Sequence, residues 1–181
     1  MKKVIVLGIT GSIAAYKGAD LCSQLVKAGH DVHVIMTKSA MQLVTPRTFF
    51  TISRNPVVTD LWETPDWKPE HIDLAEQADL LLIAPATANI LAKMAYGLAD
   101  DALSTYHISH TGPVIVAPAM NFRMWAHPAT QQNCKTLQKR GVIFVGPAEG
   151  HLACGAPGKG RFAPVEEILE AVKKIPRRLE S

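Results

Sequence analysis

The chain has 181 residues, of which 48% are hydrophobic and 19% charged, and its formal net charge is +3. This composition excludes a disordered chain, and the small charge with dispersed basic residues gives no argument for nucleic-acid binding. No apolar run approaches the length of a membrane span, and the N-terminus leads directly into a predicted strand and not into a signal peptide. The widely spaced Cys22, Cys134 and Cys154 are typical of cytosolic thiols. We expect one cytoplasmic domain over residues 1–181, with no nucleic-acid or membrane partner.

Strand-like and helix-like segments alternate along the chain. Apolar runs predict strands over residues 3–8, 31–36, 78–84, 112–118 and 142–145. Helical patterns are expected over residues 12–28, 39–52 (interrupted at Pro46), 89–96, 101–109, 127–140 and 164–174. Residues 55–69 and the Gly-rich residues 146–161 are expected to be loops. This alternation predicts a three-layer, doubly wound α/β domain with a parallel sheet.

Asn121 is the first candidate for a functional residue. It follows the predicted buried strand over residues 112–118, which Pro118 should end because proline cannot donate to a strand ladder. Ligands of open α/β sheets bind at the carboxyl ends of the strands. A carboxamide there can both donate and accept, which suits a substrate carboxylate or the edge of a flavin ring. The alternative is an asparagine that only forms the turn.

The turn from Gly8 to Ile13 is a candidate phosphate site, because Gly11 and Ser12 stand at the start of a predicted helix. It does not match the dinucleotide fingerprint, which needs G-x-G-x-x-G and an acidic residue about twenty positions later. The second strand instead ends at Thr37, Lys38 and Ser39, which suit a second phosphate contact. A mononucleotide such as FMN therefore fits better than NAD. An ordinary turn capped by Ser12 is the alternative.

Further polar residues lie at expected strand ends or in loops. Thr87 and Asn89 begin a predicted helix, where capping explains one of them more readily than both. Residues 150–161 have the length of a lid and contain Cys154, whose thiol, with an ordinary pKa of roughly 8.5, could donate a proton. A surface loop with an incidental cysteine is the alternative. His71 is a candidate catalyst or a structural histidine. His107 and His110 lack an evident third ligand, so no metal site is expected.

Five motifs in this order resemble the flavin-dependent cysteine decarboxylases, and most closely their branch that acts on phosphopantothenoylcysteine. They are G-S-I at 11–13, H-I-D-L at 71–74, P-A-T-A-N at 85–89, P-A-M-N-F-R-M-W at 118–125, and A-C-G with G-R between 153 and 161. The resemblance covers nearly the whole chain. One departure is visible, because the family's flavin segment commonly ends S-A-N-T and this chain has Ile90 at the last position.

The resemblance implies a Rossmann-like flavoprotein fold and FMN-dependent decarboxylation of 4'-phospho-N-pantothenoylcysteine to 4'-phosphopantetheine in coenzyme A biosynthesis. Oxidation at the carbon bearing sulfur would give a thioaldehyde that accepts electrons as carbon dioxide leaves, and reduction of the enethiolate would complete the reaction. The implied catalytic residues are His71, Asn121 and Cys154. The implied cofactor-binding residues are Gly11, Ser12, Ile13, Thr37, Ser39, Thr87, Ala88, Asn89 and Ala119. The substrate-binding residues are Asn121, Met124, Ala153, Lys159 and Arg161, of which Lys159 and Arg161 are assigned to the substrate phosphate from their charge.

Three alternatives share this fold. A peptidyl-cysteine decarboxylase would not be expected to carry the segment around Cys154, and a flavin prenyltransferase would not need the histidine, asparagine and cysteine together. A flavin-binding regulatory subunit typically lacks one of these residues. The chain is expected to be the monofunctional form without a synthetase domain. The resemblance also implies a homotrimer or homododecamer with active sites at subunit interfaces, and the apolar residues 55–69, with Trp62 and Trp67, could form that contact.

Overall fold

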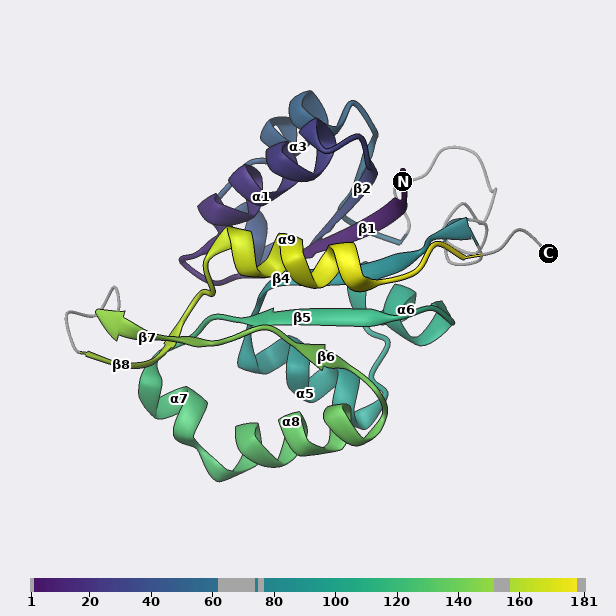
Figure 1. The fold of residues 1–181 in the computed structure, drawn as a ribbon. Coiled ribbons are helices and arrows are strands. Elements are labelled where there is room, and N and C mark those ends of the chain that lie inside the picture. Colours follow the sequence, from purple (N-terminus) through teal and green to yellow (C-terminus); the bar gives the residue numbers. More distant parts are fainter. Residues whose placement is uncertain (1, 62–73, 75–76, 152–156, 179–181) are drawn as a thin grey trace.

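The computed structural model describes residues 2–61, 74, 77–151 and 157–178. Its centre is a parallel sheet of six strands in the order β3-β2-β1-β4-β5-β6 (Figure 1). The strands are β1 (Val4–Ile9), β2 (Asp31–Met36), β3 (Val57–Val58), β4 (Leu80–Ala86), β5 (Val114–Pro118) and β6 (Ile143–Phe144). All seven residues of β4 are buried, as expected for a strand covered on both faces.

Helices cover both faces of this sheet (Figure 1). One face packs against α1 (Ala15–Lys27), α3 (Pro46–Ser53) and α9 (Val165–Lys174). The other packs against α5 (Ala88–Tyr96), α6 (Ala102–Ser109) and α8 (Pro128–Lys139). Two shorter helices, α2 (Lys38–Met41) and α7 (Phe122–Ala126), follow β2 and β5. The predicted doubly wound fold is confirmed. None of the helices in the described part of the chain is long and apolar enough to cross a membrane.

Helix α1 illustrates how the apolar pattern creates the core. Leu21, Cys22 and Leu25 are fully buried on one face of the helix, as their spacing predicts. Burial raises the pKa of the Cys22 thiol to about 12, because a thiolate in the core would lose its hydration. Cys22 is therefore a core residue. Gly29 follows the helix with φ of +87°, the left-handed conformation expected after a helix end.

The third strand was predicted over residues 78–84, and its predicted end before Pro85 was wrong. Strand β4 runs from Leu80 to Ala86, and its register against β5 shifts between Ile83 and Ala86. Such an irregularity accommodates a proline because the residue that lacks an N–H is skipped by the ladder. Strand β3 and helix α7 were also missed. Both are too short, at two and five residues, to produce a readable periodicity.

The glycine-rich segment was wrongly predicted to be only a loop. It contains an antiparallel hairpin of β7 (Ala148–His151) and β8 (Pro157–Arg161), which forms a second, two-stranded sheet. Two of its glycines are explained by close packing, because a Cβ atom on Gly158 would lie 2.8 Å from the Phe122 Cβ, and one on Gly160 would lie 2.3 Å from the Met120 carbonyl oxygen. Side chains are thus absent where the hairpin contacts the segment after β5.

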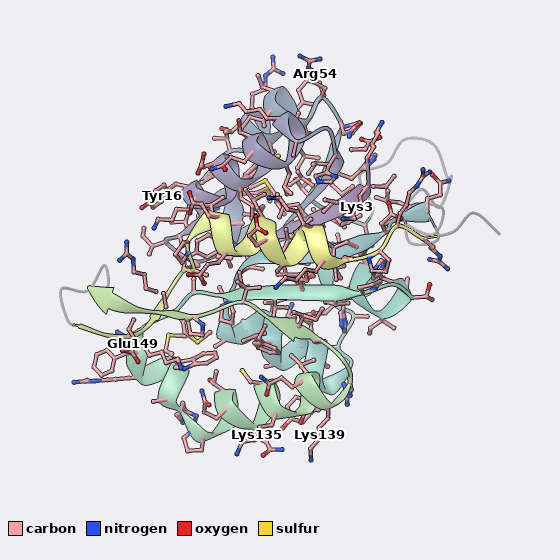
Figure 2. The ribbon with its side chains drawn as sticks, in the orientation of Figure 1. Lys3, Tyr16, Arg54, Lys135, Lys139 and Glu149 are labelled. Atoms are coloured by element: carbon pink, nitrogen blue, oxygen red, sulfur yellow. The ribbon has the colours of Figure 1, made fainter. Side chains whose placement is uncertain are left out.

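Hydrogen bonds at the amino end of β1 join segments near the two ends of the chain. The buried Lys3 donates from Nζ to the Val172 carbonyl at the end of α9, at 2.9 Å (Figure 2). The Asp79 carboxylate accepts from the Val4 N–H at 2.8 Å and from the Arg178 N–H at 2.6 Å. These bonds fix the amino end of β1. The site described next lies at the other end, where the carboxyl ends of the parallel strands meet.

Candidate functional site

A cavity of about 640 Å³ lies at the carboxyl edge of the sheet. Its volume is within the roughly 300–1,000 Å³ of small-molecule sites. Four segments line it: residues 11–14 with Tyr16 and Lys17, then Thr87, then residues 119–121 with Met124, and finally residues 160–162. These segments follow β1, β4 and β5 and form the end of β8, so the sheet places distant parts of the sequence around one cavity.

The turn after β1 is linked to the turn after β4. The buried Thr10 donates from Oγ1 to the Pro85 carbonyl at 2.7 Å and accepts from the Thr87 N–H at 3.1 Å. Thr87 in turn is the N-cap of α5, and its Oγ1 accepts from the Ile90 N–H at 3.3 Å. Capping therefore explains Thr87. The side chain of Asn89, the second residue of the helix, is exposed.

Gly11 lets the segment after β2 approach the same turn. A Cβ atom at Gly11 would lie 2.4 Å from the Ser39 Cβ, so no larger residue fits without displacement. Thr37 begins α2, where its Oγ1 accepts from the Ala40 N–H at 3.3 Å. Thr37 and Ser39 thus lie beside the turn but do not line the cavity.

Asn121 lies in the cavity wall between β5 and α7. Its Oδ1 accepts from the Arg123 N–H at 2.8 Å, which caps α7 and orients the carboxamide. Two backbone bonds fix the preceding residues: the Ala119 N–H donates to the Ala86 carbonyl at 3.0 Å, and the Met120 N–H donates to the Gly160 carbonyl at 2.9 Å. The turn role was therefore right, and the same bond holds Asn121 at the cavity.

The charged side chains that line the cavity are cationic in the described part of the chain. Lys17 and Arg161 line it, and none of the described lining residues is a carboxylate. The first turn of α1 also contains no acidic residue, so its partial positive charge is not neutralised locally. The Lys17 Nζ lies 5.9 Å from the centre of the Tyr16 ring. This arrangement favours an anionic ligand with an apolar portion.

Eight of the predicted site residues line the cavity and five others do not. Those that line the cavity are Gly11, Ser12, Ile13, Thr87, Ala119, Asn121, Met124 and Arg161. Those that do not are Thr37, Ser39, Ala88, Asn89 and Lys159. The predictions on His71, Ala153 and Cys154 lie outside the described residues. Lys159 and Arg161 diverge because the hairpin register shifts between them: Arg161 pairs with Ala148 and Lys159 with Glu149. The extra residue on β8 changes the relative direction of the Lys159 and Arg161 side chains.

Six lining residues were missed from the sequence: Ala14, Tyr16, Lys17, Met120, Gly160 and Phe162. Helical spacing could have found two of them, because Tyr16 and Lys17 follow Ile13 by three and four residues and such positions are neighbours on a helix surface. Figure 2 shows Tyr16 on the same side of the molecule as the β7–β8 hairpin. Ala14 directly follows Ile13 in the same segment, whereas Met120, Gly160 and Phe162 depend on the packing of the hairpin on residues 120–122. Among the described residues, no three histidine, cysteine or acidic side chains form a group that could hold a metal.

Comparison with known families identifies the family of this chain. The model of the family described as Flavoprotein matches residues 1–176. The chain belongs to the Flavoprotein family. The match includes every segment that lines the cavity, and it also includes residues 62–73 and 152–156, which lie outside the described part.

Individual proteins are also similar to this chain. The coenzyme A biosynthesis bifunctional protein CoaBC of Bacillus subtilis (strain 168) is 46% identical over 173 residues, which are 94% of this chain and 42% of that protein. A cysteine-to-serine variant of PPC decarboxylase, complexed with pantothenoylaminoethenethiol, has a TM-score of 0.84 and 31% identity, covering 96% of this chain and 97% of that one. The FMN-dependent cysteine decarboxylase SpaF has a TM-score of 0.79 and 30% identity, covering 94% and 97%. The chain spans less than half the length of the bifunctional relative.

Proposed function

We propose that this chain binds FMN in the cavity and decarboxylates 4'-phospho-N-pantothenoylcysteine to 4'-phosphopantetheine, a reaction of coenzyme A biosynthesis. The observation that carries the proposal is that Asn121 and the Gly11–Ser12 turn, which are far apart in sequence, line one cavity. The similarity to a coenzyme A biosynthesis protein and to PPC decarboxylase supports the choice of substrate.

The residues of the cavity fit FMN. Gly11 lets the segment that contains Ser39 pack against the turn, and the largely buried Ser12 adds a hydroxyl beside the amino end of α1, which suits a phosphate. The cations Lys17 and Arg161, with no carboxylate among the lining residues that the structure describes, favour an anion. Thr87 and Ala119 would contact the rest of the cofactor. Bound FMN would supply reversible hydride transfer, which this chain's side chains cannot perform.

The protein residues would bind the substrate and move protons. Asn121, oriented by its bond to the Arg123 N–H, would hold the substrate carboxylate through its carboxamide. His71 would position the substrate or act as a base, and the Cys154 thiol would give a proton to the enethiolate left by loss of carbon dioxide. Arg161 remains a candidate for the substrate phosphate, and Lys17 replaces Lys159 as the second cation because it lines the cavity.

A second candidate function is decarboxylation of a peptide with a C-terminal cysteine. The similarity to SpaF, which is named as an FMN-dependent cysteine decarboxylase, supports it. Both candidate substrates end in a cysteine that carries a carboxylate and a thiol. The rest of the substrate therefore distinguishes the two functions. A flavin-binding regulatory subunit would bind FMN and turn over neither substrate.

We further propose that copies of this chain assemble as a trimer or a multiple of it. Three side chains at the cavity, Ile13, Tyr16 and Met124, are apolar or aromatic and are 64%, 62% and 48% exposed. Apolar groups around an open cavity favour burial against another surface. A second copy that covers them would complete the site. Trp62 and Trp67, which suggested this contact from the sequence, lie outside the described residues.

Three measurements on the purified protein test the function. Its absorbance spectrum should be that of a flavoprotein, and denaturation should release FMN and not FAD. Phosphopantothenoylcysteine should be converted to phosphopantetheine with release of carbon dioxide, faster than a peptide ending in cysteine. A colourless protein that FMN cannot reconstitute would overturn the cofactor assignment, and turnover of the peptide alone would overturn the substrate.

A further inference from the structure

Thr10 is a buried polar residue that lies beside the cavity and joins two of its walls. Only 1% of Thr10 is exposed. Its Oγ1 donates to the Pro85 carbonyl and accepts from the Thr87 N–H, at 2.7 and 3.1 Å. The hydroxyl therefore bridges segments that lie 75 and 77 residues from it in the sequence. The hydroxyl donates its proton to the Pro85 carbonyl and uses one lone pair to accept from the Thr87 N–H.

The two bonded segments are the ones that we assign to FMN. Gly11 and Ser12 follow Thr10 directly in the turn after β1, and Thr87 lines the cavity from the turn after β4. Parallel strands β1 and β4 are paired from Ile5 to Gly8, so their ladder does not extend to these turns. The spacing of the two walls is thus fixed locally by the Thr10 hydroxyl.

We propose that Thr10 is a positioning residue for the flavin: it holds the Gly11–Ser12 turn and Thr87 at the separation that FMN requires without touching the cofactor. This inference rests on the proposed function. Preorganised contacts raise affinity because the bound arrangement need not be formed on binding. Loss of the hydroxyl should therefore weaken FMN binding, in addition to any loss of stability from the buried groups it leaves unpaired.

The test compares Thr10→Val with Thr10→Ser. Valine has a similar shape but no hydroxyl, and serine keeps the hydroxyl. FMN affinity is measured by quenching of flavin fluorescence on titration into the apoprotein, and stability by thermal unfolding of the same apoprotein. We expect Thr10→Val to weaken FMN binding about tenfold or more, the effect of one to two lost hydrogen bonds, and Thr10→Ser to stay within about threefold of the wild type.

Val172→Ala provides the matched control. Val172 is buried in α9, packs in the core and does not line the cavity, so its truncation lowers stability without changing the walls. If Thr10→Val loses no more affinity than Val172→Ala of comparable melting temperature, Thr10 is only a structural residue and the proposal is wrong. If Thr10→Ser loses as much as Thr10→Val, the hydroxyl is not the responsible group and the proposal is also wrong.

If Thr10→Val does not fold, hydrogen exchange in the wild-type apoprotein tests the proposal instead. The Thr87 amide proton should be protected before FMN is added, because a buried hydroxyl accepts it. Exchange at the rate of an unstructured peptide would mean that the bridge is absent and would overturn the proposal. A wild-type protein that has a protected Thr87 amide but does not bind FMN would instead contradict the proposed function, so the two failures are distinguishable.

Discussion

The Met120 N–H donates a hydrogen bond to the Gly160 carbonyl at 2.9 Å, and this bond joins the β7–β8 hairpin to the turn that contains Asn121. The two residues are so close that a Cβ atom at Gly160 would lie 2.3 Å from the Met120 carbonyl oxygen. The hairpin contributes Arg161 to the cavity and the turn contributes Asn121. Their relative position therefore depends on a close backbone contact that the absence of a side chain at Gly160 allows.

Substitution of Gly160 by alanine should separate the hairpin from this turn, because the obstructing atom belongs to the backbone. We expect kcat/KM for phosphopantothenoylcysteine to fall about tenfold or more, since small displacements of a positioned group are costly for catalysis. Gly29→Ala is the control: Gly29 also has a positive φ, but nothing lies within 4 Å of its Cβ position. It should lower stability with little change in kcat/KM. Equal losses of activity in both variants would contradict this account.

The proposed roles of Cys154 and Asn121 predict different products. Serine is a much weaker acid than a thiol, so Cys154→Ser should still oxidise and decarboxylate the substrate and then release an enethiol two hydrogens short of phosphopantetheine. Asn121→Asp should block the earlier reaction, because two carboxylates repel each other. Mass spectrometry of the products distinguishes these cases. Normal formation of phosphopantetheine by Cys154→Ser would show that the thiol is not the proton donor.

Asp101 predicts a defined dependence of stability on pH. Its carboxylate caps α6 by accepting from the Ser104 N–H at 2.8 Å and pairs with the Lys93 Nζ at 2.6 Å. Burial acts to raise the pKa of Asp101, but the bonds from Lys93 and Ser104 outweigh it and hold the pKa below its usual 3.8. Because the folded state binds this proton less tightly, the carboxylate's contribution is complete above pH 3.8 and is lost as the pH falls through the lower folded pKa.

Asp101→Ala should therefore lower the free energy of unfolding by about 1–2 kcal/mol at pH 7, the usual cost of a lost helix cap. The difference from the wild type should shrink as the pH falls below 3.8. Denaturant unfolding at several pH values measures both effects. The exposed Asp20, which accepts from Gln24 on α1, provides the control. Asp20→Ala should change stability by less than about 0.5 kcal/mol. A constant difference at all pH values would contradict the assignment.

The proposed assembly can be tested by substitution of Tyr16, whose ring is exposed. Light scattering of the wild-type protein should give the mass of a trimer or a multiple of it. Tyr16→Glu should yield smaller species and weaker activity, because a charge in an apolar contact is costly to desolvate. Tyr96, which is 75% exposed and does not line the cavity, is the matched position, and Tyr96→Glu should keep the trimer. A fully active wild-type monomer would rule out a site shared between subunits.

The sequence by itself determined the fold class and the edge at which the site lies. Buried apolar runs such as residues 112–118 identify strands of a parallel sheet, and the turn after each run falls at the same edge, so Asn121, Thr87 and the Gly11–Ser12 turn could be placed before the structure was known. These inferences depend on local periodicity and chain direction, which a single sequence contains.

Only the tertiary structure decided which of these residues share a cavity. The hairpin of β7 and β8 was missed because its glycines carry no apolar alternation, and the reason for them is their contact with residues 120–122. Lys17 lines the cavity and Lys159 does not, because a helix turn aims the first inward and a register shift aims the second away. Thr10 is similar: its partners, Pro85 and Thr87, are distant in sequence, and only the packing of the turn after β1 against the turn after β4 brings them within hydrogen-bond distance.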